Sequence, residues 1–546
     1  MEQRDRTFFE YCCKDSCVTY EISEHLDNKL KGASLEHYRL NIALLNPLLD
    51  MEMRGIRYDI EGAASRRALL QTKMYEAQAR LNALTGYCFD WKSLAAIRQH
   101  ATELMSKKKG GILKPYIEAA ERLNNLVTMP NPSLASIGEI EDLLDKSLNV
   151  GSTSFRDYLY TTLQLPPQYN EDEKKNQVLT ADYEALLKLS KHLSEQKESI
   201  AYQVIQLAIQ IRALQTRQGM LAIAADSDGR IRCGYNIVGS ETGRITCYTS
   251  PTGSGYNLQT IPNYDHVDDA PGGVLGDRDL FLADEGYWLF QCDLSGADGW
   301  TVAAYSAMLG DRTLLDDLQA GLKPAKILAL KLRDYKVNFD ERESLKAVMH
   351  IIKKEDWDYF ACKRVYHGAD YLEGDITISR NILKDSEGKL FMPPKECKPL
   401  KEFFFQRYRG VKLYHNWIAT QLRSRAVPSL TAASGQTRRF FDRADNILPK
   451  AVAFEPQAVT TYATNLAMYN LWTDKENRSG TKLTIQPLHT IHDALMGQFP
   501  KEYTKWAVKR IKGYFNNTIH IAGQPIVIPY EGNYGSSWGN LKEGTI

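Results

Sequence analysis

Hydrophobic positions along the chain follow helical spacing in some regions and strand-like runs in others. The clearest helical pattern lies near residue 200, where apolar side chains recur three or four positions apart and so share one helix face. These residues are Ile200, Val204, Leu207, Ile211 and Leu214. The pattern also predicts helices over residues 1–30, over most of 60–226 and over 311–425, the last with a loop at 385–396.

Strand-like patterns occupy the segments that flank the second helical region. Gly, Ser, Thr, Asn and Pro crowd residues 234–264, which is typical of short strands and turns. Residues 287–292 predict a buried strand, and Ser295 is expected to cap the helix that follows it. Further strands are expected within 483–499 and 525–529. Two mixed segments around a helical one indicate a single split domain with a helical insertion.

An apolar stretch precedes the first long helical region. It covers residues 40–59, is interrupted by Pro47, and ends in a turn at 54–56 that leads into a short strand.

Composition narrows the class of protein. The chain has 546 residues, of which 43% are hydrophobic and 25% charged, so we expect three or four globular units. The net charge is only +1, so nucleic-acid binding would depend on local basic clusters. One such cluster is Lys107–Lys109, which is also typical of a solvated loop.

The nine cysteines include no CxxC pair, which favours free, mostly buried thiols over a structural zinc site. No apolar run reaches about 18 residues, and the first ten residues show no apolar signal region. We therefore expect a cytoplasmic protein with no membrane partner, which in a virus means the host cytoplasm.

Two aspartates are the main candidates for chemistry. Asp293 ends the predicted strand, and Asp493 interrupts another apolar segment directly after His492. A carboxylate at the end of a buried strand is unfavourable unless it is paired or bound to a metal. If the two meet, a divalent cation between them would relieve their repulsion. Each aspartate alone is more typical of a turn residue at the end of a strand than of a metal site.

Residues 357–371 supply a third group of candidate residues. On a helix, Lys363, His367 and Tyr371 are spaced four residues apart and share one face. A lysine there would suit phosphate groups, and the aromatic rings would suit a base or sugar.

Together these residues resemble the motifs of family A DNA polymerases, the bacterial polymerase I type. Asp293–Ser295 resembles the first catalytic motif, Lys363–Tyr371 the fingers-helix motif, and His492-Asp493 the His-Asp-Glu motif. Weaker likenesses follow the family's order along the chain: Asn149–Ser152, Thr242–Arg244, Asn257–Pro262, Arg278 with Phe281, Gln457 and Gly535–Trp538.

The resemblance implies an α/β (α+β) right-hand polymerase fold, with an antiparallel palm sheet, helical fingers and a helical thumb. The expected division is as follows: 1–34 the end of a 3′–5′ exonuclease domain, 35–60 a connection, 61–226 the thumb, 227–310 and 426–546 the palm, and 311–425 the fingers. An insertion near 91–147 would sit on the thumb and suit either partner docking or a solvated decoration.

The resemblance also implies a mechanism and site residues. Two Mg²⁺ ions, with Mn²⁺ as a substitute, would be held by Asp293, Asp493 and the Leu294 carbonyl, with Lys363 at the triphosphate. Primer-template DNA and deoxynucleoside triphosphates would be the substrates of this replication enzyme. The nucleotide-binding set would be Leu294, Ser295, Asp298, Lys363, His367, Tyr371 and Arg278. The DNA-binding set would be Arg244, Asn257, Gln259, Gln457 and His492.

The chain departs from the family pattern at several positions. Asp298 replaces the glutamate that helps to exclude a ribose hydroxyl, and His367 replaces Phe or Tyr. Tyr359 replaces an arginine, so the phosphate grip is expected from Lys354 or Arg364. Other departures are Leu372 in place of glycine and Ala494 in place of glutamate. Such divergence is similar to that of phage enzymes.

Near the N-terminus, Tyr11 and Asp15 resemble the last motif of the family's proofreading exonuclease. Only ten residues precede Tyr11, so we expect no proofreading by this chain alone. A separate exonuclease polypeptide or a processivity factor is a candidate partner, and a vestigial helix is the equal alternative.

Two other functions remain open from the sequence. A single-subunit RNA polymerase shares the three main motifs, and Asp298 is compatible with it. A catalytically silent protein that binds primer-template DNA is the second alternative, although both aspartates are present.

Overall fold

The computed structural model describes most of the chain. A few residues between 122 and 142 are described only singly, so most of the expected insertion at 91–147, including Lys107–Lys109, lies outside the described residues. The continuous described ranges are 3–86, 148–171, 176–249, 256–262, 276–424, 426–441 and 444–546.

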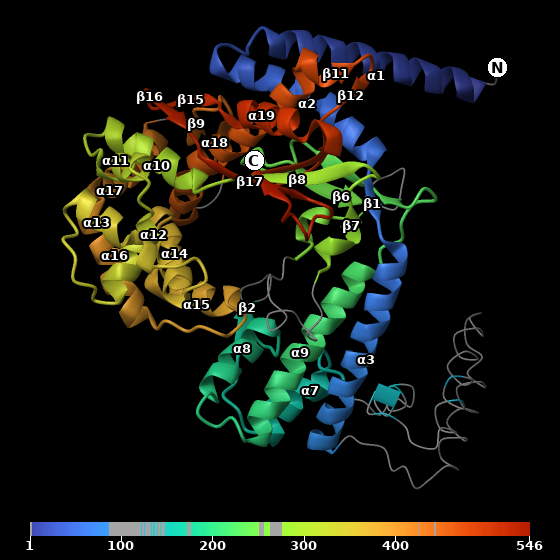
Figure 1. Ribbon diagram of the computed structural model, residues 1–546, viewed down its shortest axis with the longest axis vertical. Coiled ribbons are helices and arrows are strands. Elements are labelled where there is room, and N and C mark those ends of the chain that lie inside the picture. The colour runs from blue at the N-terminus through green and yellow to red at the C-terminus, as the bar shows by residue number, and fades with distance from the viewer. Residues whose placement is uncertain are drawn as a thin grey trace.

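The N-terminal part of the chain is helical (Figure 1). Its helices are α1 (Gln3–Asp27), α2 (Ala33–Arg54), α3 (Ile60–Thr85), α7 (Thr153–Asp157), α8 (Tyr183–His192) and α9 (Ile200–Leu221). The expected helix within 1–30 is confirmed as α1. Helix α2 runs through Pro47, where we expected an interruption. The buried side chains of Leu44, Leu48 and Met51 hold this helix against the core despite the hydrogen bond that proline removes.

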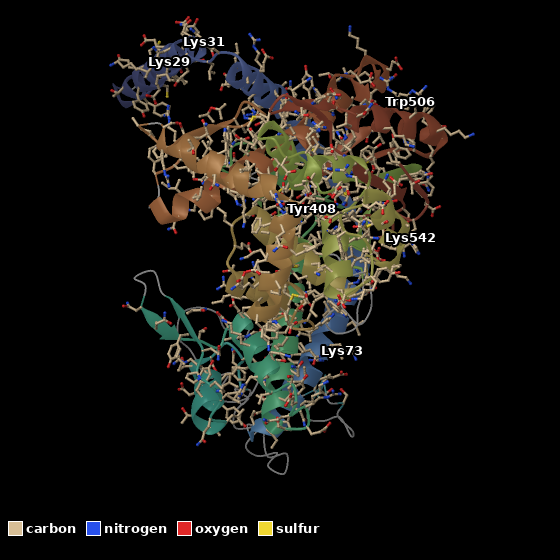
Figure 2. All side chains as sticks on the ribbon, turned by 90° about the vertical axis from the view of Figure 1, so that its left-hand side faces the viewer. Lys29, Lys31, Lys73, Tyr408, Trp506 and Lys542 are labelled. Carbon is tan, nitrogen blue, oxygen red and sulfur yellow. The ribbon has the colours of Figure 1, made fainter. Side chains whose placement is uncertain are left out.

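Helices α3 and α9 pack side by side and form a unit with its own core. Val204, Ile211 and Leu214 are fully buried on α9, which confirms most of the predicted stripe, whereas Ile200 is 53% exposed at its start. Figure 2 shows this unit at the bottom of the molecule, with Lys73 on α3, and the larger body above it around Tyr408.

A buried ion pair joins α9 to the larger body. The guanidinium of Arg217 donates hydrogen bonds of 2.6 and 2.8 Å to the carboxylate of Asp277, and both side chains are almost completely inaccessible to solvent. Since breaking such a pair leaves an uncompensated charge, it fixes how the helical unit meets the body.

The body contains a five-stranded antiparallel sheet with the strand order β13-β14-β8-β17-β18. Its strands are β8 (Tyr287–Leu294), β13 (Gln486–Ile491), β14 (Ala494–Pro500), β17 (Tyr530–Gly535) and β18 (Gly544–Thr545). The strand expected at 287–292 is therefore the centre of the sheet, and the expected strands within 483–499 lie on one side of it.

Smaller sheets surround the central one. A three-stranded sheet has the order β4-β1-β7, and two hairpins are formed by β5 with β6 and by β9 with β10. The bounds are β1 (Ile56–Tyr58), β2 (Tyr169–Glu171), β3 (Gln177–Leu179), β4 (Arg230–Ile231), β5 (Cys233–Asn236), β6 (Thr246–Thr249), β7 (Phe281–Leu282), β9 (Ser429–Thr431), β10 (Thr437–Arg439), β11 (Arg478–Ser479), β12 (Lys482–Leu483), β15 (Thr518–Ile521) and β16 (Gln524–Val527).

A helical region between β8 and β9 packs beside the sheet (Figure 1). Its helices, with the two that follow it, are α10 (Ala297–Met308), α11 (Thr313–Gln319), α12 (Pro324–Leu332), α13 (Arg342–Val348), α14 (Trp357–Asp370), α15 (Asp375–Asp385), α16 (Pro394–Arg407), α17 (Arg409–Arg423), α18 (Ala444–Thr473) and α19 (Thr504–Phe515). The predicted loop at 385–396 is confirmed between α15 and α16. Among the described residues, no helix combines the length and apolar character needed to cross a membrane.

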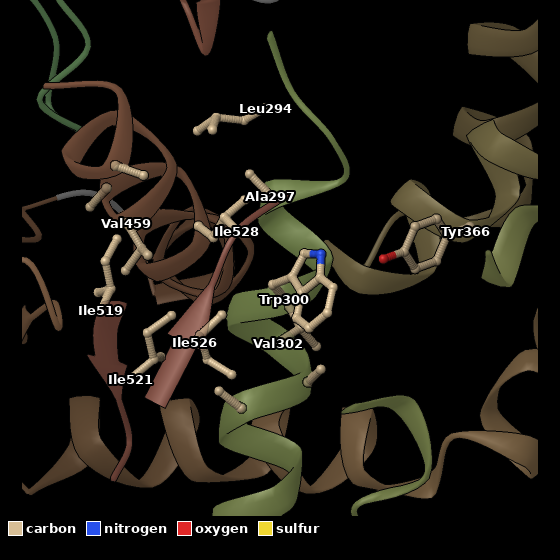
Figure 3. Packing of buried hydrophobic residues seen from close by; sticks show 14 of the residues in the cluster. Leu294, Ala297, Trp300, Val302, Tyr366, Val459, Ile519, Ile521, Ile526 and Ile528 are labelled. Carbon is tan, nitrogen blue, oxygen red and sulfur yellow. The ribbon is translucent and has the colours of Figure 1, made fainter. Parts of the chain in front are cut away.

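Helix α10 connects the sheet to this helical region through a continuous core. Figure 3 shows Trp300 on α10 between Ile528, which directly follows β16, and Tyr366 on α14. A side chain at position 299 would clash with the phenolic oxygen of Tyr366, so glycine there allows α14 to approach α10 closely.

Candidate active site

Asp293 lies near the end of β8, in the middle of the sheet. The strand register sets Ala494 of β14 on one side of it and Glu531 of β17 on the other. Directly opposed residues in antiparallel strands project from the same face of the sheet. Two carboxylates, Asp293 and Glu531, therefore project from the same face of the sheet, near the end of the central strand.

Asp493 reaches the same place through a tight turn. His492 and Asp493 are the two residues that join β13 to β14, since Ile491 pairs with Ala494. His492 has a left-handed backbone with φ of 54°, which is uncommon for a residue with a side chain and typical of two-residue hairpin turns. The backbone N–H of Leu294 donates a 3.2 Å hydrogen bond to the carbonyl of Asp493. Asp293 and Asp493, far apart along the chain, are thus neighbours.

The surroundings disfavour charge on both aspartates. Partial burial raises the pKa of Asp293 to about 6, and repulsion from Asp493 adds to the shift. Burial also raises the pKa of Asp493, and the nearby Asp298 adds to it. Carboxylates in this situation are stabilised by a cation, and their oxygen atoms are the donors that Mg²⁺ prefers.

Asp293 opens onto a cavity of about 870 Å³ between the sheet and the helical region. Leu294 and Ser295 continue the wall from β8, while Lys363 and His367 line it from α14. The predicted helix at 357–371 is confirmed as α14, so the cation and the imidazole expected on one face do face the aspartate across the cavity.

Burial has different consequences for the two groups on α14. It lowers the pKa of Lys363, with further lowering from Arg364, while Asp293 and Asp493 oppose that shift. Burial also lowers the pKa of His367 to about 4, so the imidazole is neutral at pH 7. The cavity therefore presents one cation and one neutral ring from this helix.

Tyr371 and Asp298 lie together at the other end of α14. The Tyr371 hydroxyl donates a short hydrogen bond to the Asp298 carboxylate, and the Thr460 hydroxyl donates another of 2.8 Å. The shorter side chain of Asp298 is thus held in place from two directions.

Arg278, like Asp298 and Tyr371, is not among the residues that line this cavity. Its guanidinium donates to the carbonyl of Ile261 and lies 4.4 Å from the centre of the Trp538 ring. Trp538 in turn packs against Phe281. Arg278, Phe281 and Trp538, which resemble separate family motifs, therefore form one cluster.

The predicted DNA-binding residues group around the β13–β14 turn. Arg244 lies close enough to His492 and Asp493 to influence the pKa of each. Asn257 caps a short helix through its side-chain oxygen, and Gln259 donates to the carbonyls of Ile245 and Thr490. Gln457 is half-buried on α18. The contact of each with DNA stays a prediction.

The expected helix cap at Ser295 is wrong. Helix α10 begins after Gly296, whose left-handed φ of 64° makes the turn, and no side chain caps it. The backbone N–H of Ser295 instead donates a 2.7 Å hydrogen bond to Pro529, which extends the pairing of β8 with β17. Ser295, just beyond the end of β8 at Leu294, therefore continues the pairing with the β17 segment through its backbone.

Two charged residues of the cavity escaped the sequence analysis. Lys323, before α12, and Glu531 both line it, and Glu531 forms ion pairs of 2.7 Å with Lys354 and 3.7 Å with Lys323. Arg364, the other candidate for phosphate grip, pairs with Asp385 and is not among the cavity's lining residues. Lys323 precedes a Pro that begins a helix, which is a local signal too common to mark a site.

The two residues that resemble an exonuclease motif lie on α1. Tyr11 is 61% exposed, and Asp15 is exposed on the same helix, which extends from the body in Figure 1. No acidic cluster gathers around them among the described residues. The expectation that this chain does not proofread alone stays a prediction.

Comparisons with known proteins show the fold of the chain and its similarity to one family. The polymerase domain of polymerase 1 from M. smegmatis, solved in complex with DNA primer-template and dNTP, matches 96% of this chain and 75% of its own length, with a TM-score of 0.60 and 18% identity. The chain therefore has the right-hand fold of a polymerase domain.

Residues 121–352 match the family model described as DNA polymerase family A. DNA polymerase I of Treponema pallidum is 24% identical over 410 residues, which cover 74% of this chain and 36% of that protein. The chain thus spans about a third of this curated relative. Residues 121–352 are thus similar to family A DNA polymerases. The expected phage origin stays a prediction.

Proposed function

We propose that this chain is a template-directed DNA polymerase, which adds deoxynucleotides to a primer 3′-hydroxyl and releases pyrophosphate. The observation that carries the proposal is the meeting of Asp293 and Asp493 beside a cavity whose opposite wall bears Lys363 and His367. The similarity of residues 121–352 to family A DNA polymerases supports the same reaction.

The donor set at the aspartates fits divalent metal ions. Asp293, Asp493 and the carbonyl of Leu294 would hold them. Burial first, and repulsion between neighbouring carboxylates second, raise the pKa of both carboxyl groups, and a bound cation would relieve both effects. Two Mg²⁺ ions, with Mn²⁺ as a substitute, would activate the primer hydroxyl and neutralise charge on the pyrophosphate.

Lysines of the cavity would hold the triphosphate. Lys363 is placed to neutralise it and, because burial lowers its pKa, is suited to give a proton to the leaving group. Lys354 and Lys323 supply further positive charge, and Glu531 holds both on the cavity wall when no phosphate competes.

The neutral ring of His367 and the hydroxyl of Tyr371 would lie next to the sugar and the base of the incoming nucleotide. His367 lines the cavity, and Tyr371 holds Asp298 one helix turn further along α14. The primer-template would lie over the β13–β14 turn, where Arg244 and His492 gather next to Asp493.

The packed units support a division of the chain by function. We infer that residues 227–310 and 426–546 form the palm, 311–425 the fingers and 61–226 the thumb. The parts of α3 and α9 away from the sheet have a core of their own, whereas Leu70 and Leu214 belong to a second core that they share with one face of the sheet. One core shared by sheet and fingers suits a site built between them.

Primer extension tests the function directly. The purified chain, a DNA primer-template and Mg²⁺ should yield extended primer with deoxynucleotides, and Asp293→Asn and Asp493→Asn should each reduce the rate by more than about a thousandfold. Asp340→Asn is a matched control, because Asp340 is exposed and is not among the residues that line the cavity.

Either of two results would refute the proposal. One is wild-type protein that binds primer-template DNA without extending it. The other is extension that survives both substitutions, because the aspartates would then not be the site. Extension with ribonucleotides and no primer would instead favour an RNA polymerase.

A further inference from the structure

Away from the cavity, two cysteines and a histidine come together inside the body. Cys233 of β5, Cys247 of β6 and His489 of β13 are buried, and their potential ligand atoms all lie within 4.8 Å of one another. The polymerase chemistry proposed above makes no use of them.

The hairpin register explains why the two thiols meet. Cys247 pairs directly with Tyr235, and Cys233 lies two residues before Tyr235 on the same strand. Side chains two residues apart and directly opposed side chains share one face of a hairpin. Cys233, Tyr235 and Cys247 therefore project together from the β5–β6 hairpin.

The histidine is turned toward this face by an irregularity in the sheet. Between Pro487 and His489 the register of β13 against β14 shifts by one residue, which is a β-bulge. Bulges re-aim the side chains that follow them. The fully buried His489 ring thus comes from the edge of the large sheet to the thiols of the hairpin.

Hydrogen bonds around His489 leave one ring nitrogen available. Its Nδ1 lies 2.9 Å from the hydroxyl of Tyr235, and that hydroxyl is also 3.3 Å from the carbonyl of Leu488. In the tautomer with its proton on Nδ1, Nδ1–H donates to the hydroxyl, the hydroxyl donates to the carbonyl, and the lone pair is left on Nε2. Nε2 is buried and has no hydrogen-bond partner among the residues that the structure describes.

The sulfur atoms have the separation that a shared metal requires. Cys233 Sγ and Cys247 Sγ are 3.9 Å apart, far longer than a disulfide bond. Two thiolates on one tetrahedral zinc ion, each at about 2.3 Å, are about 3.8 Å apart. Metal-binding histidines commonly donate the other ring N–H to a fixed acceptor, which is the role that Tyr235 has here.

We propose that Cys233, Cys247 and His489 bind a zinc ion that cross-links the β5–β6 hairpin to β13. Two thiolates and a neutral imidazole are the donors that zinc prefers, and the two negative charges balance the ion in an apolar surrounding. The connection matters for the neighbouring site, since β13 leads into the Asp493 turn and the hairpin loop carries Arg244.

Sequence spacing gives little indication of this site. The two cysteines lie on different strands of a hairpin, and the histidine follows them more than two hundred residues later. Because the three residues are so far apart in the sequence, the sequence analysis found no CxxC pair and predicted free thiols. All the cysteines that the structure describes have free thiols.

Metal content and cobalt substitution test the proposal. The full chain, purified under reducing conditions, should contain about one equivalent of zinc by elemental analysis. Replacement of that zinc by Co²⁺ should give a thiolate-to-cobalt charge-transfer band, which carboxylate ligands such as Asp293 and Asp493 do not produce. Removal of the ion by a chelator should lower Tm by several degrees, because the metal stabilises only the folded chain.

Substitutions assign the band to these residues. Cys233→Ser, Cys247→Ser and His489→Gln should each lose at least tenfold in Co²⁺ affinity, while Cys397→Ser, which also removes a buried thiol, should retain the wild-type affinity. Circular dichroism of each variant checks that it has folded.

The wild-type measurement decides the matter even if the variants do not fold. Fully reduced wild-type protein that binds neither Zn²⁺ nor Co²⁺ through thiolate would overturn the proposal, as would a Cys233–Cys247 disulfide in the purified protein. A thiolate band that persists at full strength in folded Cys233→Ser and Cys247→Ser would also overturn it.

Discussion

The hydroxyl of Tyr371 donates a hydrogen bond to the carboxylate of Asp298, joining the end of α14 to the first turn of α10. Thr460 of α18 holds the other oxygen of that carboxylate. Three helices from separate parts of the chain thus meet at one acidic side chain beside the proposed nucleotide site. This is the aspartate that the sequence analysis matched with a glutamate of the family pattern.

Removal of the Asp298 carboxylate is expected to weaken discrimination against ribonucleotides. Asp298→Ala leaves space and no negative charge near the sugar, so the preference for deoxynucleotides should fall by about tenfold, or roughly 1.4 kcal/mol. The ratio of kcat/KM values for insertion of a deoxynucleotide and the matching ribonucleotide measures it. Asp298→Glu should preserve the preference, and an unchanged ratio in Asp298→Ala would show that the sugar is selected elsewhere.

Lys354 is expected to contribute to triphosphate binding more than Arg364. Lys354 lines the cavity, whereas Arg364 pairs with Asp385 outside its lining. A lost charge-assisted contact of about 1.5–3 kcal/mol predicts that Lys354→Ala lowers kcat/KM for nucleotide insertion by about tenfold or more. Arg364→Ala is the control and should change it by less than about threefold. The reverse order of effects would contradict this assignment of the phosphate grip.

Glu455 is expected to make stability depend on pH. It is almost fully buried on α18, and burial raises its pKa to about 7, against a lowering from the Tyr305 hydroxyl. Between its ordinary pKa of 4.5 and this value, the folded chain binds more protons than the unfolded chain. Its free energy of unfolding therefore falls as the pH rises through that window.

The matched substitution is Glu455→Gln, which removes the charge and keeps the shape. At pH 8 it should raise the free energy of unfolding by up to about 3 kcal/mol, and below pH 4.5 the gain should vanish. Denaturant titrations over this pH range provide the measurement, with the exposed Glu285→Gln as control. A gain that does not grow with pH would mean that Glu455 is paired or hydrated in solution.

Patterns within single elements allowed much of the fold to be predicted. The strand at 287–292, the stripe on α9 and the helix at 357–371 all show local periodicity, and each is present. The proximity of Asp293 and Asp493 was also expected, from the order of the motifs. Cross-strand relationships did not, since Glu531 enters the site only because β17 pairs with β8, and Lys323 only because α12 faces the same cavity. Ser295 was misjudged because one left-handed glycine moved the start of α10.

The residue that follows Tyr371 offers a last test of the backbone. Leu372 stands where the family pattern has glycine, and its φ of 62° lies in the left-handed region. A residue with a side chain in this conformation destabilises the folded chain by about 1–2 kcal/mol. Glycine removes this strain, but its greater freedom in the unfolded chain offsets part of the gain. With 37% of Leu372 exposed, little apolar burial is lost. Leu372→Gly should therefore raise the free energy of unfolding by about 0.5–1 kcal/mol in denaturant titrations, whereas Leu372→Ala, which retains the strain, should not. A Leu372→Gly protein less stable than Leu372→Ala would show that the chain has another conformation at this position.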